Sequence, residues 1–145
     1  MELGIGMFGD LSFDQTTGKY SDAGIKIREI LQQVKLMDEV GIDVESLDRD
    51  FSVVEKKALS EDEIDDLEKD KRNEQLAIYW CAKEAIYKRM SQNRVVYAEQ
   101  IEVEKFNVRK EGELEATFIH KDEHEEEFEL EYMIFDRHVL VWLVG

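Results

Sequence analysis

The sequence has no proline, a single cysteine and no long apolar run. Average usage would place about seven prolines in a chain of this length, so no proline-rich stretch marks a stiff linker. Cys81 alone permits no internal disulfide and suits a reducing compartment. No stretch approaches the roughly 18 apolar residues of a membrane span, and the first residues show no signal-peptide pattern. We therefore expect a cytoplasmic protein with no membrane partner.

Positive charge is also scarce. The 145 residues include 19 Lys and Arg against 35 Asp and Glu, which gives a formal net charge of −16. Nucleic acids call for a basic surface, so this balance argues against a nucleic-acid partner. Apolar residues make up 43% of the chain and include two Trp, five Tyr and seven Phe. This is enough for one core, and we expect a single domain over residues 1–145.

The spacing of apolar residues changes from helical to alternating along the chain. It predicts short strands over 2–8 and 42–47, and helices over 22–40, 51–59, 60–69 and 73–90. Ser60 and Glu63 have the spacing of a capping box. From about residue 99 the period is two, which predicts strands over 99–107, 113–120, 126–135 and 138–145. These strands predict an antiparallel meander with one solvent-exposed face. We therefore expect an α+β fold with the long helix packed on the meander.

The first candidate motif is "GIDVE", residues 41–45. Side chains two apart on a strand point the same way, so Asp43 and Glu45 would present two carboxylates to one side. Mg²⁺ takes oxygen ligands, usually one or two carboxylates together with water and phosphate oxygens. Taken alone, the pattern also fits a polar strand end.

The second motif is "WCAKEAIYK", residues 80–88. Trp80, Glu84 and Lys88 are spaced by four and share one helix face, and Lys83 flanks them. One interpretation is a surface ion pair between Glu84 and Lys88, worth a few tenths of a kcal/mol. The other is a site for a metal-bound diphosphate, in which a carboxylate holds the metal and an ammonium group contacts phosphate oxygens.

Together the two motifs resemble the signature pair of the 4′-phosphopantetheinyl transferases, G-[IV]-D-x-E followed by [WF]-[SCT]-x-K-E-[AS]-x-x-K. The separation of the second and third acids, 84 − 45 = 39 residues, is also typical of that family. The resemblance covers roughly residues 41–145 and is strongest to the C-terminal half of the larger, surfactin-synthetase-type members.

The resemblance implies an activity and a role for each motif residue. Asp43, Glu45 and Glu84 would hold Mg²⁺ against the diphosphate of coenzyme A, and Lys83 and Lys88 would contact phosphates. Glu84 would also help to deprotonate the acceptor serine of an acyl or peptidyl carrier protein. The reaction is an in-line displacement at the β-phosphate, with 3′,5′-ADP as the leaving group.

The N-terminal residues, about 1–43, resemble a different family. They look like the first strand, loop and helix of luciferase-like flavin monooxygenases, so the chain reads as a chimera. A complete barrel of roughly 250 residues is needed for that activity, and one strand-helix unit cannot supply a flavin site.

Two hypotheses on function therefore remain open. One is an active transferase, and the alternative is a catalytically inactive, recombined or engineered acidic scaffold that retains only a divalent-cation site. A homo-oligomer is also possible, because the small holo-acyl-carrier-protein synthases build their sites between the protomers of a trimer. His120 and His124 flank a predicted turn among acidic residues, a pattern that fits a solvated turn better than a transition-metal site.

Overall fold

The computed structural model describes residues 13–14, 19–20 and 41–144. Contacts divide the chain into two compact units, residues 1–39 and 40–145. In the first unit, β1 (Phe13–Asp14) pairs antiparallel with β2 (Lys19–Tyr20), between the strand predicted over 2–8 and the helix predicted over 22–40. The strand predicted over 2–8 and the helix predicted over 22–40 lie outside the described residues. A single domain over the whole chain stays a prediction.

The second unit contains a five-stranded antiparallel sheet in the order β3-β7-β6-β5-β4. Its strands are β3 (Ile42–Ser46), β4 (Ile101–Val103), β5 (Glu111–Ile119), β6 (Glu125–Phe135) and β7 (His138–Leu143). Strands β4 to β7 form the predicted meander, and β3 joins its far end by pairing with β7. Strand β4 is shorter than the predicted 99–107, because residues 99–100 belong to a one-turn helix and residues 104–107 form neither helix nor strand.

Four helices complete this unit, and the α+β class is confirmed. They are α3 (Ser52–Ala58), α4 (Glu61–Asp65), α5 (Arg72–Met90) and α6 (Tyr97–Gln100). The predicted capping box is present, since the Ser60 hydroxyl accepts from the Glu63 amide and the Glu63 carboxylate accepts from the Ser60 amide. The sequence did not predict α6, because four residues are too few for a periodic pattern. Among the described residues, no helix combines the length and apolar character needed to cross a membrane.

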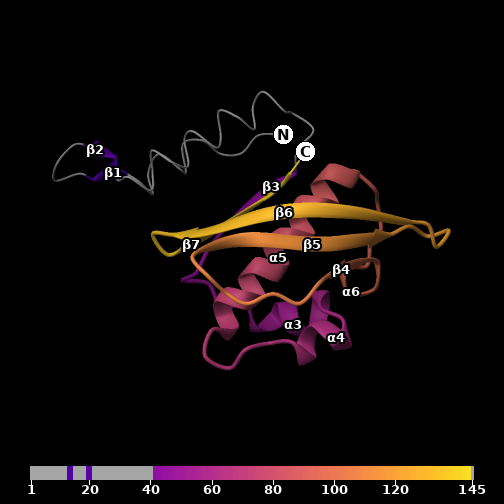
Figure 1. The fold of residues 1–145 in the computed structure, drawn as a ribbon, viewed down its shortest axis with the longest axis horizontal. Coiled ribbons are helices and arrows are strands. Elements are labelled where there is room, and N and C mark those ends of the chain that lie inside the picture. The colour runs from indigo at the N-terminus through magenta and orange to yellow at the C-terminus, as the bar shows by residue number, and fades with distance from the viewer. Residues whose placement is uncertain (1–12, 15–18, 21–40, 145) are drawn as a thin grey trace. The chain divides into compact units, whose positions relative to one another are not determined.

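The core lies between α5 and one face of the sheet (Figure 1). Alternate residues of the strands face this helix, among them Leu114, Phe118, Tyr132 and Val141, and all are buried. Strand β3 approaches α5 very closely at Gly41. A Cβ atom built there would lie 1.9 Å from the carbonyl oxygen of Ala85, so only glycine allows this contact. The glycine of "GIDVE" therefore sets how near the first motif comes to the second.

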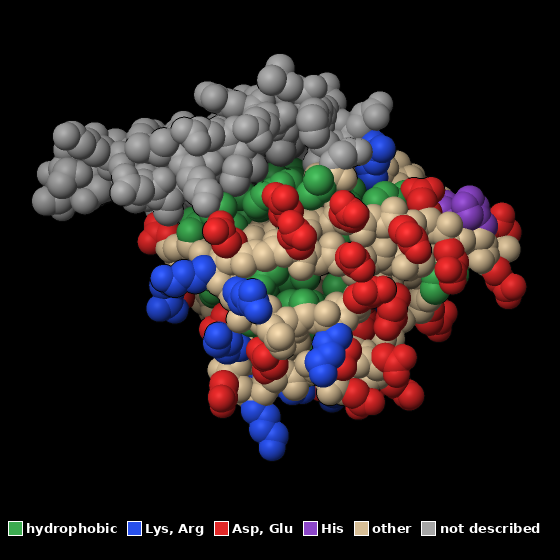
Figure 2. All heavy atoms as spheres, viewed as in Figure 1, with side chains coloured by type: hydrophobic (Ala, Val, Ile, Leu, Met, Phe, Trp, Pro, Cys, Tyr) green, Lys and Arg blue, Asp and Glu red, His purple; other side chains and the backbone are tan. Residues whose placement is uncertain are grey.

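The opposite face of β5 and β6 is strongly acidic. Glu113 lies directly across from Glu131, and Glu115 from Glu129. These side chains alternate with the buried ones, and Figure 2 shows acidic groups gathered over the two strands. Like charges directly opposite each other in an antiparallel pair are destabilising. This face consequently lowers the stability of the hairpin at low ionic strength.

We expect Glu129→Lys to stabilise the protein by about 0.2–1 kcal/mol at low salt, because it replaces a repulsive cross-strand pair by an attractive one. The gain should shrink in high salt, where exposed charges are screened. Urea denaturation at two ionic strengths measures it. Glu127→Lys is the matched control, since Glu127 lies on the same strand across from Thr117. Equal gains from both variants at low salt would contradict the cross-strand explanation.

Candidate active site

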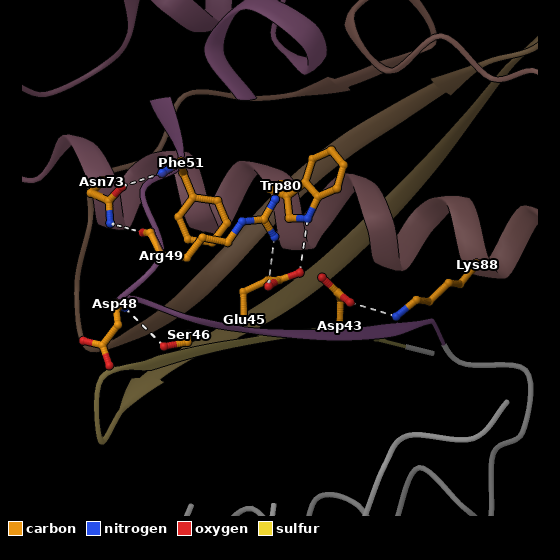
Figure 3. A network of polar contacts seen from close by, with 9 residues as sticks. All are labelled: Asp43, Glu45, Ser46, Asp48, Arg49, Phe51, Asn73, Trp80 and Lys88. Carbon is orange, nitrogen blue, oxygen red and sulfur yellow. Dashed lines mark hydrogen bonds and ion pairs between the residues drawn. The ribbon is translucent and has the colours of Figure 1, made fainter. Parts of the chain in front are cut away.

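Strand β3 presents two carboxylates toward α5, as the alternation of a strand requires (Figure 3). Asp43 is buried, and its Oδ1 accepts a hydrogen bond from Lys88 Nζ on α5 at 2.8 Å. The same ammonium donates to the backbone carbonyl of Ile42 at 3.0 Å. Lys88 thus joins the second motif to the first, which the sequence alone could place only on separate elements.

Glu45 is held by two donors from different parts of the chain. Its Oε1 accepts from the indole Nε1 of Trp80 at 3.3 Å, and its Oε2 accepts from Arg49 Nη1 at 3.3 Å (Figure 3). A carboxylate oxygen can accept more than one partner. The carboxylate is therefore oriented while keeping the capacity to bind a cation.

Glu84 lies one helical turn from Trp80 and from Lys88 on α5. Its Oε1 accepts a hydrogen bond from the Tyr97 hydroxyl at 2.9 Å. The ring of Tyr97 lies 5.6 Å from the Trp80 ring, centroid to centroid. Burial and the nearby Glu84 carboxylate both raise the pKa of Tyr97. The phenol stays protonated and serves as a donor that orients Glu84.

The three carboxylates are close enough to affect one another. Burial raises the pKa of Asp43 from 3.8 to about 6, Lys88 opposes this shift, and the charges of Glu45 and Glu84 add to it. Asp43 Oδ2 is buried and has no hydrogen-bond partner among the residues that the structure describes. A buried carboxylate oxygen without a donor, close to two further carboxylates, favours the binding of a cation. An all-oxygen donor set suits Mg²⁺, so these residues fit that ion.

The carboxylates of Asp43, Glu45 and Glu84 nevertheless have different partners, and their oxygens are not gathered on one point. In the part of the chain that the structure describes, the group with ligand atoms all within 4.8 Å of one another is His120, His124 and Glu126. That group belongs to the turn between β5 and β6 and contains none of the residues predicted to hold Mg²⁺.

Lys83 is not brought to this site. Its fully buried Nζ donates to Glu63 Oε1 at 2.7 Å and to the carbonyls of Ala58 and Tyr97 at 2.6 and 3.1 Å. Successive helical residues point about 100° apart, so Lys83 cannot face the same way as Glu84. All three N–H groups of the ammonium are used. The phosphate contact predicted for Lys83 would require this buried ion pair to break.

Tyr97, Arg49 and Glu63 are residues of the site and its support that the sequence analysis did not single out for these roles. Glu63 was identified only as a capping residue, and Arg49 follows the first motif by four positions. Tyr97 lies 13 residues beyond Glu84 in a helix of four residues. No local spacing connects Tyr97 or Glu63 to the motifs, and only the fold brings them there, whereas Arg49 lies four positions after its partner Glu45.

We expect Lys83→Met to reduce the free energy of unfolding by about 3–5 kcal/mol, because it leaves the Glu63 carboxylate buried without its cation. Lys88→Met should cost less, since the Lys88 side chain is 33% exposed and water can solvate Asp43 in its place. Urea denaturation of both variants measures the difference. Similar losses of unfolding free energy in the two variants would mean that the buried Lys83–Glu63 pair does not contribute more than the exposed pair.

The pKa of Asp43 predicts a pH dependence of stability. Because its folded-state pKa is raised from 3.8 to about 6, folding favours the protonated form. The resulting stabilisation is complete below about pH 4 and is lost as the pH rises through about 6. Asp43→Asn should lack this loss, so the stability of the parent relative to the variant should fall by up to roughly 3 kcal/mol. Urea denaturation in EDTA measures the free energy of unfolding of both proteins across this pH range. If it changes with pH in the same way for both, the prediction is wrong.

A comparison with family models identifies this constellation. A model described as the 4′-phosphopantetheinyl transferase superfamily matches residues 39–141, which is more than half of the chain and spans both motifs. The comparison with curated proteins returned no match. The family match supports a phosphopantetheinyl-transferase type of function in general. The chain belongs to the 4′-phosphopantetheinyl transferase superfamily.

Proposed function

We propose that this protein transfers the 4′-phosphopantetheine group of coenzyme A to a serine of an acyl or peptidyl carrier protein, with Mg²⁺ as its cation. Membership of the family supports the type of reaction. The observation that carries the proposal for this chain is the pairing of β3 with α5, which places Asp43 and Glu45 beside the face of Glu84 and Lys88. The same elements supply the negative and positive groups that a cation-bound diphosphate needs.

Asp43, Glu45 and Glu84 are the residues that would hold the cation. The orphaned oxygen of Asp43 favours a positive ligand, and the donors on Glu45 keep that carboxylate in place. A bound Mg²⁺ would neutralise charge on the diphosphate of coenzyme A. Among the described residues, Lys88 pairs with Asp43 and Arg49 pairs with Glu45. The three carboxylates therefore still carry one negative charge more than these two cations offset.

Lys88 is the residue best placed to contact a phosphate. An ammonium has three N–H groups, and two of them donate to Asp43 Oδ1 and to the carbonyl of Ile42. On this one-third exposed side chain, the third N–H meets no acceptor among the described residues. It can donate to a phosphate oxygen while the bonds to β3 persist, which fixes the ammonium before the substrate arrives.

Glu84 is the residue that would accept the proton of the serine. As the serine oxygen bonds to the β-phosphorus, the bond to the departing 3′,5′-ADP breaks and the hydroxyl proton passes to a carboxylate oxygen. The Tyr97 hydroxyl holds Glu84 Oε1 at 2.9 Å, which limits the rotation of that carboxylate. Positioning of this kind accounts for most of the rate gain in phosphoryl-type transfers.

The carrier protein is expected to be acidic, so it needs a local basic surface on this acidic chain. Lys83 cannot contribute, because it is fully buried. Arg89 and Arg94 are exposed and follow Lys88 at the end of α5. We propose that this end of the helix faces the carrier protein.

The test is the intact mass of an apo-acyl and an apo-peptidyl carrier protein after incubation with this chain, coenzyme A and Mg²⁺. We expect a gain of one phosphopantetheine, and a rate at least a hundredfold lower with Glu84→Gln, in line with the loss of a general base. Glu74→Gln is the matched control, since Glu74 lies in the first turn of the same helix. Circular dichroism verifies that each variant is folded.

Two outcomes would contradict the proposal. A mass gain that Glu84→Gln leaves unchanged would remove Glu84 from the reaction. No gain with either carrier, from a folded chain that still binds Mg²⁺, would favour the alternative of an inactive scaffold that retains only a cation site.

A further inference from the structure

We propose that the turn between β5 and β6 binds a first-row transition-metal ion such as Zn²⁺ through His120, His124 and Glu126. One ligand atom from each of these residues lies within 4.8 Å of the others. Rotation of the more exposed His124 and Glu126 side chains would bring their ligand atoms onto an ion at His120. This site is built from other residues than the carboxylates of β3 and α5, and the reaction proposed above does not use it.

The hairpin itself brings the two histidines together. The amide of His120 donates to the carbonyl of His124 at 2.8 Å, and the amide of Glu123 donates back to the carbonyl of His120 at 2.9 Å. This closes the turn and places the two imidazoles side by side, with ring centroids 4.7 Å apart. Glu126 is the second residue of β6, and its Oε1 lies 3.6 Å from His120 Nε2. Figure 2 shows histidine side chains among acidic ones at this end of the sheet.

The strongest observation is a nitrogen without a partner. Among the described residues, His120 Nε2 is buried and makes no hydrogen bond. Glu126 Oε1 lies 3.6 Å away, which is beyond hydrogen-bonding distance but within that of an ion pair when the imidazole is protonated. Buried polar atoms are nearly always paired, so each exception calls for an explanation. The His120 ring is fixed by edge contact with Phe118, with centroids 4.8 Å apart. This contact limits the rotation that would turn Nε2 toward water.

The other nitrogen of His120 has a partner that would prepare the ring for a metal. The side-chain amide of Gln92, just beyond α5, lies 3.3 Å from Nδ1. The oxygen and nitrogen of such an amide are assigned from their partners. With the amide oxygen accepting from Nδ1–H, Nε2 carries its lone pair toward His124 and Glu126. Metal-binding histidines commonly donate their second nitrogen in this way.

The donor set selects the class of ion. Two imidazoles and a carboxylate suit zinc and its neighbours, whereas Mg²⁺ takes oxygen ligands. Three protein ligands leave a position for water or another group. Asp122, Glu123 and Glu125 are exposed around the turn and raise the local concentration of cations. A bound ion would link β5 to β6 and, through Gln92, fix the turn against the end of α5.

The experiment is a Zn²⁺ titration of the full chain by competition with a chromophoric chelator, in a large excess of Mg²⁺ that occupies oxygen-only sites. We expect one Zn²⁺ per chain. His124→Ala and Glu126→Gln should each weaken binding at least tenfold, and His138→Ala should not change it, because His138 lies at the start of β7 outside the cluster. His124 is exposed, so this variant is not expected to disturb folding.

A second measurement separates a defined site from loose attraction to acidic groups. Zn²⁺ should raise the melting temperature of the parent and of His138→Ala, and should leave that of His124→Ala unchanged. The proposal is overturned if the folded parent binds no Zn²⁺ at micromolar concentration, or if His124→Ala binds it as tightly as the parent.

Discussion

The buried ammonium of Lys83 is the interaction on which the arrangement around α5 depends. It donates to the end of α3 through Ala58, to Glu63 of α4 and to the backbone of Tyr97 in α6. The other oxygen of Glu63 accepts from the amide of Val103 on β4 at 2.8 Å. A buried ion pair costs desolvation, and the surrounding hydrogen bonds must compensate for it. Here they join four separate elements to one position on the long helix.

The same helix carries the candidate site on its neighbouring face. Lys83 and Glu84 are adjacent in the sequence, but they point about 100° apart, one into the interior and the other toward β3. Tyr97 connects the two sides, since its carbonyl binds Lys83 and its hydroxyl binds Glu84. The orientation of the carboxylate proposed to take the serine proton consequently depends on a purely structural ion pair. A change in that pair would alter the site without touching any group in it.

The strong negative charge of the chain is distributed in three distinct ways. On the outer face of β5 and β6, paired glutamates repel one another in the solvent. Between β3 and α5, three carboxylates meet two cationic side chains, since Lys88 pairs with Asp43 and Arg49 with Glu45, and burial raises the pKa of Asp43. At the β5–β6 turn, Glu126 lies beside two imidazoles. The first arrangement only costs stability, while the other two favour cations of different chemistry, because one offers oxygen donors alone and the other offers nitrogen as well.

Local spacing was sufficient to predict α5, the meander and the capping box, since the period of apolar residues determines which side chains share a face. It also placed Asp43 with Glu45 and Glu84 with Lys88, because each pair lies within one element. The tertiary structure alone decided that β3 pairs with β7, almost a hundred residues away, because alternation within a strand does not specify its partner. It also decided that Lys83 is buried, that Tyr97 reaches Glu84 and that His120 Nε2 has no hydrogen-bond partner among the described residues. Each of these depends on contacts between distant residues, which only the folded backbone brings together.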